Sequence, residues 1–354
     1  FQTALYTGNA GTNNITFDGN SDMQPNLIWI KERGGTGSHI WVDTVRGISS
    51  SSTPFIKSNS TGAEVTNNVN AFVTSSNSDG FSLGADSYFT DVNKNNSTYA
   101  SWNWKAGTSF TNDASATGIG SIDSAGSVNT DAGFSIVSYT GTGSAGTVAH
   151  GLGVAPKMII IKNRSTTNGW EVYHQSIGNT KYLALNVTDA ALASASRWNN
   201  TSPTSTVFTV NTEGGVNSNG GNLIAYCFAE KKGYSKFASY TGNGNADGTF
   251  VYTGFKPAFI LAKDADSSDN WIIHDTTRNP SNPVGAYLRP NLSSAEGTFS
   301  HYDILSNGFK NLYAGGSLNG SGKNIIYMAF ASNPFVTSTG VPATARWLCS
   351  YLLT

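Results

Sequence analysis

The feature that most constrains the fold is a phrase that recurs three times along the chain. Residues 5–10 read LYTGNA, residues 138–143 read SYTGTG, and residues 239–244 read SYTGNG. After each phrase, a proline opens an apolar run that a lysine closes six residues later: PNLIWIK (25–31), PKMIIIK (156–162) and PAFILAK (257–263). The chain therefore holds three copies of a unit of about 100 residues, a period typical of repeated domains.

Three further sets of residues keep the same register. A ring-bearing residue lies eight positions after each lysine, an Asn-x-Ser/Thr sequence follows, and an aromatic residue lies near the end of each copy. These sets are His39, Trp170 and Trp271; Asn59, Asn186 and Asn291; and Trp104, Phe228 and Phe330. A residue that recurs in register is typical of a structural position, whereas one special to a single copy is a candidate for function.

The uneven spacing of the copies predicts how they are joined. Tyr6 and Tyr139 are 133 residues apart, whereas Tyr139 and Tyr240 are 101 apart. The excess lies in a Gly/Ser/Ala-rich stretch with the composition of a linker. We expect a first β-sandwich repeat at 1–106, a linker at 107–132, a second repeat at 133–232, a third at 233–335 and a C-terminal tail at 336–354.

Composition favours an all-β fold. Charged residues are 12% of the chain, hydrophobic residues are 38%, and 39 glycines accompany abundant Ser, Thr and Asn. Short apolar or alternating runs separated by turn residues predict strands, and their number fits three tandem β-sandwiches of jelly-roll or lectin-like type. The apolar runs that close on a lysine predict central strands covered on both faces. Residues 188–198 are the best candidate for a short helix of one or two turns.

The YTG phrase has two interpretations. An aromatic strand end followed by residues that tolerate positive φ predicts a hairpin or bulged turn. A glycine-rich phosphate loop would need a helix directly after the glycines, and a strand is expected there instead. The turn is favoured.

Charge and cysteine content exclude several kinds of partner. A formal net charge of −1 provides no attraction for nucleic acid, and no apolar run is long enough for membrane insertion. Cys227 lies in an apolar run and is expected in the core, and together with Cys349 it indicates no disulfide framework. The chain begins at Phe1 without a charged-then-apolar leader.

Common catalytic motifs do not occur. The five histidines lack metal-ligand spacing, no Gly-x-Ser-x-Gly elbow appears, and the acidic segment DADSSDN (264–270) lacks a calcium pattern. A glycosidase needs two paired carboxylates, and the sequence does not pair its candidates Glu64, Asp91, Glu296 and Asp303. We therefore expect no enzymatic activity, no catalytic residue, no metal and no cofactor.

Two Asp-Thr-x-Arg turns recur in the first and third copies. They pair Asp43 with Arg46 and Asp275 with Arg278, and the second copy has His174 and Ile177 at these positions. Loss of both partners together indicates a mutual contact. We expect these pairs to hold turns and touch no ligand, contributing about 0–1 kcal/mol if exposed.

The candidate ligand site is Trp198 with Asn199 and Asn200. An exposed tryptophan stacks on a sugar ring, and neighbouring amides hydrogen-bond hydroxyl groups. Trp170 and Trp271 are instead expected in the core. The Asn-x-Ser/Thr sequences are interpreted as turn-forming asparagines, with glycosylation as the alternative.

The third copy combines YTGNG, GFKPAFILAK, DTTR, NLSSAE, SNGF, NGSG and IYMAF, and the second contains AHGLGVAPKMIIIKNR (149–164). This combination resembles a repeated domain in structural proteins of marine tailed bacteriophages, which form tail fibres and other appendages with lectin-like sandwiches. The resemblance covers residues 1–335 and implies no catalytic residues. The first copy departs from the pattern, with His39 in place of tryptophan and a longer segment NAGTNNITFDGNSDMQ.

The repeat, the low charge and the resemblance predict a non-enzymatic phage virion structural protein. We expect it in the extracellular particle, with other virion proteins and host-surface glycans as partners. The alternatives are a polysaccharide-degrading phage spike and a cellular adhesin or surface filament subunit. The apolar tail WLCSYLLT (347–354) predicts a homo-oligomer, with a trimer favoured because closed symmetry buries exposed apolar patches. The alternative is that the tail packs on its own third domain.

Overall fold

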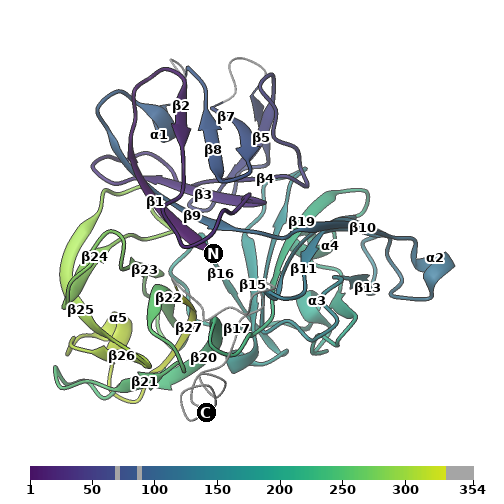
Figure 1. Ribbon diagram of the computed structural model, residues 1–354. Coiled ribbons are helices and arrows are strands. Elements are labelled where there is room, and N and C mark those ends of the chain that lie inside the picture. Colours follow the sequence, from purple (N-terminus) through teal and green to yellow (C-terminus); the bar gives the residue numbers. More distant parts are fainter. Residues whose placement is uncertain (68–71, 86–89, 332–354) are drawn as a thin grey trace, which may run out of the picture.

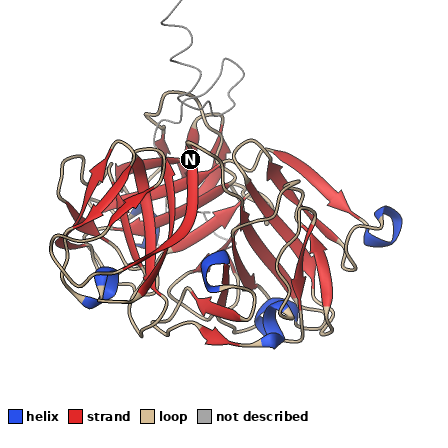
Figure 2. Cartoon of the chain, turned by 90° about the horizontal axis from the view of Figure 1, so that it is seen from below, coloured by secondary structure: helices blue, strands red, loops and turns tan. Residues whose placement is uncertain are grey.

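The computed structural model describes residues 1–67, 72–85 and 90–331 and confirms an all-β protein. Figure 1 shows three β-rich lobes about a common centre, formed by a first segment (1–106), a second (107–232) and a third (233–331). Figure 2 shows that sheets dominate and that the few helices are short. No helix in the described ranges is long and apolar enough to cross a membrane. The tail expected at 336–354 lies outside the described residues.

The first segment contains a larger and a smaller sheet. Its elements are β1 (Gln2–Thr7), β2 (Asn13–Ile15), β3 (Leu27–Glu32), β4 (Ile40–Asp43), β5 (Thr53–Lys57), β6 (Val65–Asn67), β7 (Val73–Asn77), β8 (Gly80–Leu83), α1 (Thr90–Asn93) and β9 (Thr98–Trp104). The larger sheet has the order β1-β9-β3-β4-β5-β6, and the smaller has the order β2-β8-β7.

The second segment has the largest sheet, in the order β10-β11-β12-β19-β14-β15-β16-β17, and a small β13-β18 sheet. Its elements are β10 (Thr108–Asn112), α2 (Ala114–Thr117), β11 (Ser124–Asn129), β12 (Phe134–Thr140), β13 (Gly146–Ala149), β14 (Met158–Asn163), β15 (Trp170–His174), the 3-10 helix η1 (Gln175–Ile177), β16 (Lys181–Ala184), β17 (Leu192–Ala193), α3 (Ala195–Trp198), β18 (Val207–Val210), α4 (Gly214–Asn217) and β19 (Asn222–Phe228). The single turn of α3 falls in the stretch where a short helix was expected.

The third segment has two four-stranded sheets, β20-β27-β22-β23 and β21-β26-β25-β24. Its elements are β20 (Ser235–Thr241), β21 (Phe250–Tyr252), β22 (Pro257–Asp264), β23 (Ile272–Asp275), β24 (Val284–Tyr287), β25 (Gly297–Leu305), β26 (Gly308–Asn311), α5 (Gly316–Asn319) and β27 (Asn324–Ala331). The same antiparallel order recurs in one sheet of each segment, which we call its inner sheet: β1-β9-β3-β4, β12-β19-β14-β15 and β20-β27-β22-β23. The other sheet of each segment is its outer sheet.

The apolar runs that close on a lysine are central strands, as predicted, and both of their faces are buried. In β14, Met158 and Ile160 face a core shared by all three segments, whereas Ile159 and Ile161 face the second segment's own core. Strands β3 and β22 alternate in the same way. Because side chains alternate between faces, a strand with a core on each side must be apolar throughout.

The shared core is centred on three aromatic residues that occupy the same position in the repeat. The ring centroids of Trp104 and Phe228 are 6.2 Å apart, those of Trp104 and Phe330 are 5.7 Å apart, and those of Phe228 and Phe330 are 6.2 Å apart. All three side chains are buried. The inner sheets therefore pack one face against one another, and the outer sheets cover their opposite faces.

Residues 107–132, where the sequence predicts a linker, form paired strands and a short helix of the second segment. Strands β10 and β11 form an antiparallel pair, and β11 pairs with β12, so the stretch extends the second sheet. Asp113 caps the intervening helix α2 by accepting hydrogen bonds from the backbone N–H groups of Ser115 and Ala116. A Gly/Ser/Ala-rich composition did not prevent pairing because an existing strand edge satisfied the backbone groups of β11.

The YTG phrase is a turn, but not the expected hairpin. The strand before the phrase and the strand after it belong to different sheets. In the second segment, β12 pairs with β19, whereas β13 pairs with β18. The tyrosine is anchored inside: the Tyr139 hydroxyl donates to Val216 O at 2.6 Å. Positive φ occurs where predicted, at Gly143 (71°), at Gly244 (68°) and at Ala10 (54°).

The glycine of this phrase is required by close packing. A Cβ at Gly141 would lie 2.3 Å from Ser218 O, and a Cβ at Gly8 would lie 2.2 Å from Lys94 O. We predict that Gly141→Ala lowers the free energy of unfolding by about 1–3 kcal/mol, measured by urea denaturation, because the backbone must shift. Gly11→Ala is the control, since its Cβ would come no closer than 3.6 Å to a neighbour. Equal losses in the two variants would contradict the close-packing argument.

Candidate functional site

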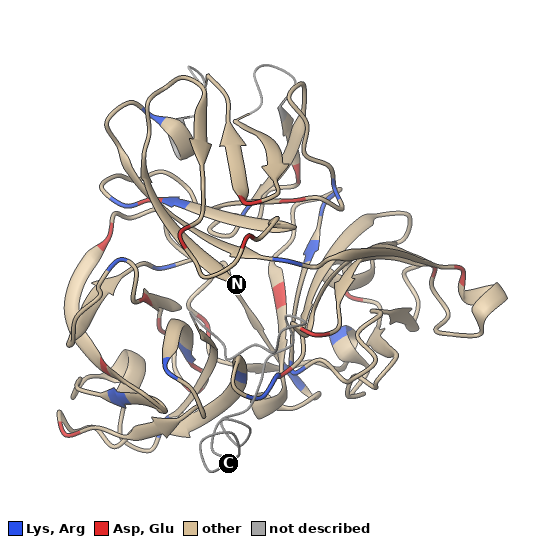
Figure 3. Ribbon diagram, in the orientation of Figure 1, with Lys and Arg blue, Asp and Glu red and all other residues tan. Residues whose placement is uncertain are grey.

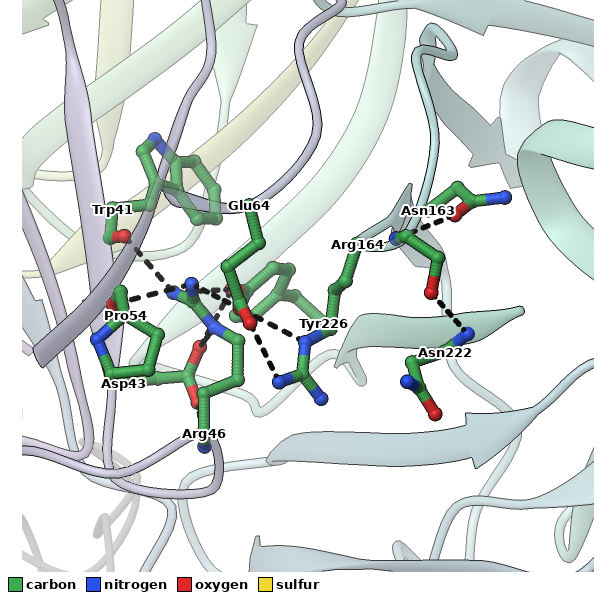
Figure 4. A network of polar contacts seen from close by, with 10 residues as sticks. Trp41, Asp43, Arg46, Pro54, Glu64, Asn163, Arg164, Asn222 and Tyr226 are labelled. Atoms are coloured by element: carbon green, nitrogen blue, oxygen red, sulfur yellow. Dashed lines mark hydrogen bonds and ion pairs between the residues drawn. The ribbon is translucent and has the colours of Figure 1, made fainter. Parts of the chain in front are cut away.

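A buried polar network joins the first and second segments (Figure 4). Arg46 Nε lies 2.6 Å from Asp43 Oδ2 with both side chains fully buried, and the Tyr226 hydroxyl donates to the same oxygen at 2.8 Å. Glu64 links Arg46, at 3.1 Å, to Arg164, at 2.8 Å. Each charge is therefore paired, as burial of a charge requires. The Glu64–Arg164 pair and the Tyr226 hydrogen bond cross the boundary between segments.

An equivalent network, formed by other residues, joins the third and first segments. Arg278 Nε lies 2.5 Å from Asp275 Oδ2, and the Trp102 indole N–H donates to that oxygen at 2.9 Å. Glu296 links Arg278, at 2.9 Å, to Arg33, at 2.8 Å. Both Asp-Arg pairs also hold their turns, because each aspartate accepts the backbone N–H of its arginine. They are fully buried rather than exposed, so the figure of about 0–1 kcal/mol for an exposed pair does not apply to them.

The boundary between the second and third segments lacks these charges. Its corresponding positions hold His174, Ile177, Ala191, Ala265 and Met328. A backbone hydrogen bond between segments occurs at all three boundaries. At the two charged boundaries, Glu64 N donates to Arg164 O and Glu296 N donates to Arg33 O. At this boundary, Ala191 N donates to Ala265 O at 2.8 Å. The residues that form the network at the other two boundaries are all replaced together at this one. A partial replacement would leave a buried charge without its partners, which is strongly destabilising.

The recurring asparagines and large rings are also structural. Each asparagine Oδ1 accepts the backbone N–H that starts the neighbouring strand: Asn59 from His39 at 3.0 Å, Asn186 from Trp170 at 2.8 Å and Asn291 from Trp271 at 3.2 Å. Trp170 and Trp271 are buried, and their indole N–H groups donate across segment boundaries to Lys57 O and Ala184 O.

The candidate ligand site at Trp198, Asn199 and Asn200 is not a stacking platform. Trp198 is only 2% exposed, and its indole N–H donates to Lys181 O at 3.1 Å. Asn199 and Asn200 are exposed and adopt positive φ after the single turn of α3. The segment is therefore a turn next to a tryptophan of the core. The polar residues beside Trp198 in the sequence suggested an exposed position, although its side chain is buried.

The candidate catalytic carboxylates are not assembled into a pair. Glu64 and Glu296 belong to different segment boundaries and to different ion-pair networks. Asp303 lies on β25 opposite Lys310, and the side chain of Asp91 lies outside the described residues. In DADSSDN, Asp264 accepts the backbone N–H groups of Asp266 and Ser267, as in a turn. No group of potential metal ligands occurs within the described ranges.

The five histidines are buried, and burial favours their neutral form. Burial lowers the pKa of His150, His174 and His301 to about 4, and it also lowers the pKa values of His39 and His274. Three of them are fixed as acceptors at Nδ1, because His39 accepts from Trp29 Nε1, His150 from Leu152 N and His174 from Ser176 N. These three rings make hydrogen bonds inside the protein and do not face a substrate.

A shallow groove runs along the outer surface of β10, β11 and β12. Thr111, Asp113, Asp123, Ser138 and Thr140 are among its lining residues. Both carboxylates have internal roles, since Asp113 caps α2 and Asp123 accepts the backbone N–H of Ala114 at 2.8 Å. The groove has a polar surface but no aromatic side chain exposed within it.

The small outer sheet of the third segment is the candidate functional site. Phe250, Tyr252 and Leu305 are 46%, 64% and 37% exposed. Tyr252 and Leu305 both lie opposite Gly308, on either side of it, and Phe250 lies opposite Lys310. We call these five residues the aromatic face. It lies at the periphery of the third lobe, on β21, β25 and β26 (Figure 1).

The aromatic face is special to the third segment. Aligned on the buried pairs Ile15–Phe81, Val148–Phe208 and Val251–Phe309, the positions of Phe250 and Tyr252 hold Asn14 and Thr16 in the first segment and Thr147 and Ala149 in the second. The first segment instead has hydrogen bonds there, from Asn77 Nδ2 to Ser82 Oγ and from Ser82 Oγ to Asn14 Oδ1. The fold therefore forms twice without exposed rings, and repeat comparison identifies them as candidates for function.

A family model described as a domain of unknown function, DUF7483, matches residues 1–334. No curated protein and no solved structure matches the chain.

Removing one partner of a buried network tests its structural role. We predict that Asp275→Ala lowers the free energy of unfolding by about 3–5 kcal/mol, measured by denaturant titration, because it leaves Arg278 buried without its carboxylate. Lys236→Ala is the control, since it removes a partly exposed pair with Glu230 and should cost less than about 1 kcal/mol. A loss below about 1 kcal/mol in Asp275→Ala would contradict the network.

Stability should fall on acidification because of the histidines. Their pKa is 6.5 before burial and about 4 for His150, His174 and His301 in the fold, so between these values only the unfolded chain binds the protons. The loss is about 2 kcal/mol per histidine at pH 5, and nothing is lost above pH 7. Thermal unfolding at pH 7, 6 and 5 measures it. His150→Asn, which keeps an acceptor for Leu152 N–H, should flatten the slope, and an unchanged slope would exclude His150.

Proposed function

Because the chain belongs to the DUF7483 family, whose function is undefined, we propose a function from its own residues. The protein is a non-enzymatic structural component of a phage virion, and it contributes to recognition of host-surface glycans. The proposal is supported by the resemblance of the YTG, PxxIxxK-type and DTTR segments to marine phage appendage proteins. Its setting is the extracellular particle, and its partners are other virion proteins.

The observation that carries the proposal is the packing of three β-rich segments into one body. The inner faces share one core that contains side chains from all three segments. Two of the three boundaries add buried ion pairs, and all three retain a backbone hydrogen bond between segments. A particle component must resist mechanical and chemical stress outside a cell, and a shared core makes local opening of one lobe costly.

The use of the ionisable groups also favours a non-enzymatic role. Glu64 and Glu296, two of the four carboxylates considered as catalytic candidates, neutralise arginines at segment boundaries. Acidic and basic residues are interspersed over the fold, without a large block of one sign (Figure 3). This distribution favours a surface that meets uncharged partners rather than one that steers an ionic substrate.

Association into a homo-oligomer, with a trimer favoured, is part of the proposal. The lobes pack around one centre rather than in a row (Figure 1). A single chain already brings three sandwiches together. The oligomer therefore rests on the apolar residues 347–354, which lie outside the described residues.

The proposed location can be tested on particles. Antibodies against this chain should label purified phage particles in immunogold electron microscopy, because a virion component remains with the particle after purification. Particles from a deletion of the gene are the control. Labelling of cell surfaces alone would favour the adhesin alternative and overturn the proposal. Release of reducing ends from host polysaccharide by the purified chain would instead favour the degrading spike.

A further inference from the structure

The side chains of the aromatic face have a defined arrangement. Phe250 and Tyr252 alternate with buried Val251, so their side chains emerge on the same side of β21, about 7 Å apart along the strand. Gly308 is between Tyr252 and Leu305 and has no side chain. A Cβ there would lie 3.2 Å from Phe250 Cε2 and 2.0 Å from Val251 O, so the Phe250 ring lies close over this glycine. Gly308 is buried, so the Phe250 ring covers the place that a side chain at this position would occupy.

Polar groups adjoin the rings. Lys310 lies between Phe250 and Asp303 in the strand register, and its ammonium group forms an ion pair with Asp247. The side chains of Lys310 and Asp247 are 37% and 81% exposed, so both retain contact with solvent. One cation beside two carboxylates gives no surplus of positive charge, which disfavours a polyanionic ligand.

The size of the face favours a small ligand over a protein. Each aromatic side chain offers about 150–250 Å² when fully uncovered, so two that are about half exposed and one leucine present on the order of 300 Å². A stable protein interface covers about 800 Å² on each partner. The face is therefore too small for a second copy of this chain, but it matches a ligand of one to three rings.

We propose that the aromatic face binds a neutral saccharide. The C–H groups on one side of a pyranose carry partial positive charge and rest against the electron-rich face of the Tyr252 or Phe250 ring. The sugar hydroxyls exchange hydrogen bonds with Lys310, Asp247 and Asp303, which supply both a donor and acceptors. The choice of a glycan rests on the proposed function, whereas the position of the site rests on the exposed rings and their absence from the other two segments.

Binding can be measured with the full chain and a defined panel of sugars. The panel contains neutral oligosaccharides of glucose, galactose, mannose and N-acetylglucosamine, together with a uronic-acid and a sulfated oligosaccharide. We expect saturation-transfer NMR to detect at least one neutral member, with a Kd on the order of 1 mM because the contact is small. The acidic members should give no signal.

The matched variant takes its residues from the first segment. F250N/Y252T places there the Asn14 and Thr16 that this fold already accommodates, so it should remain folded. It should weaken binding about tenfold or more through loss of both rings. Tyr252→Trp should retain binding. Leu192→Thr, at a 47% exposed leucine of the second segment, is the control and should leave binding unchanged.

Three outcomes would overturn the inference. The first is that no neutral sugar gives a saturation-transfer signal with the wild type. The second is that F250N/Y252T binds sugar as well as the wild type does. The third is that the wild type binds no sugar but self-associates, and that the double variant abolishes this self-association. The last would assign the face to a second copy. Failure here is distinct from failure of the proposed function: labelled particles without sugar binding reject only the aromatic face, whereas sugar binding by a chain absent from particles rejects only the virion role.

Discussion

Contact among three inner sheet faces is the constraint on which the rest of the structure depends. Trp104, Phe228 and Phe330 contact one another at the centre, and strands β3, β14 and β22 present alternate side chains to the core around them. An isolated lobe would expose this entire face to water. Because burial of apolar area is the main driving force of folding, burial of these faces stabilises all three lobes together.

The three boundaries meet this constraint by two different chemistries. Two use a buried aspartate and arginine with a glutamate and a second arginine, and the third uses His174, Ile177, Ala191, Ala265 and Met328. The backbone hydrogen bond between segments is the same at all three. Backbone geometry therefore sets how the lobes meet, and side chains can be polar or apolar provided that the whole set changes together, because a partial set leaves a buried charge unpaired.

The outer sheets are freer than the inner ones. They cover only the distal core of their own lobe, and one side of each faces solvent. The first lobe uses this freedom for hydrogen-bonded polar side chains such as Asn14 and Ser82, and the third uses it for exposed Phe250 and Tyr252. A rigid centre with variable outer surfaces separates the residues that stabilise the molecule from those available for recognition.

The sequence by itself determined the all-β class, the fully buried strands and the core positions of Trp170 and Trp271, because these follow from local periodicity and from recurrence in register. Only the tertiary structure decided that residues 107–132 pair as strands, that the YTG turn connects two sheets, and that Trp198 is buried. It also decided the partner of Glu64, which is Arg164, 100 residues away. Pairing and burial of this kind depend on which distant surfaces meet, and no local pattern encodes that.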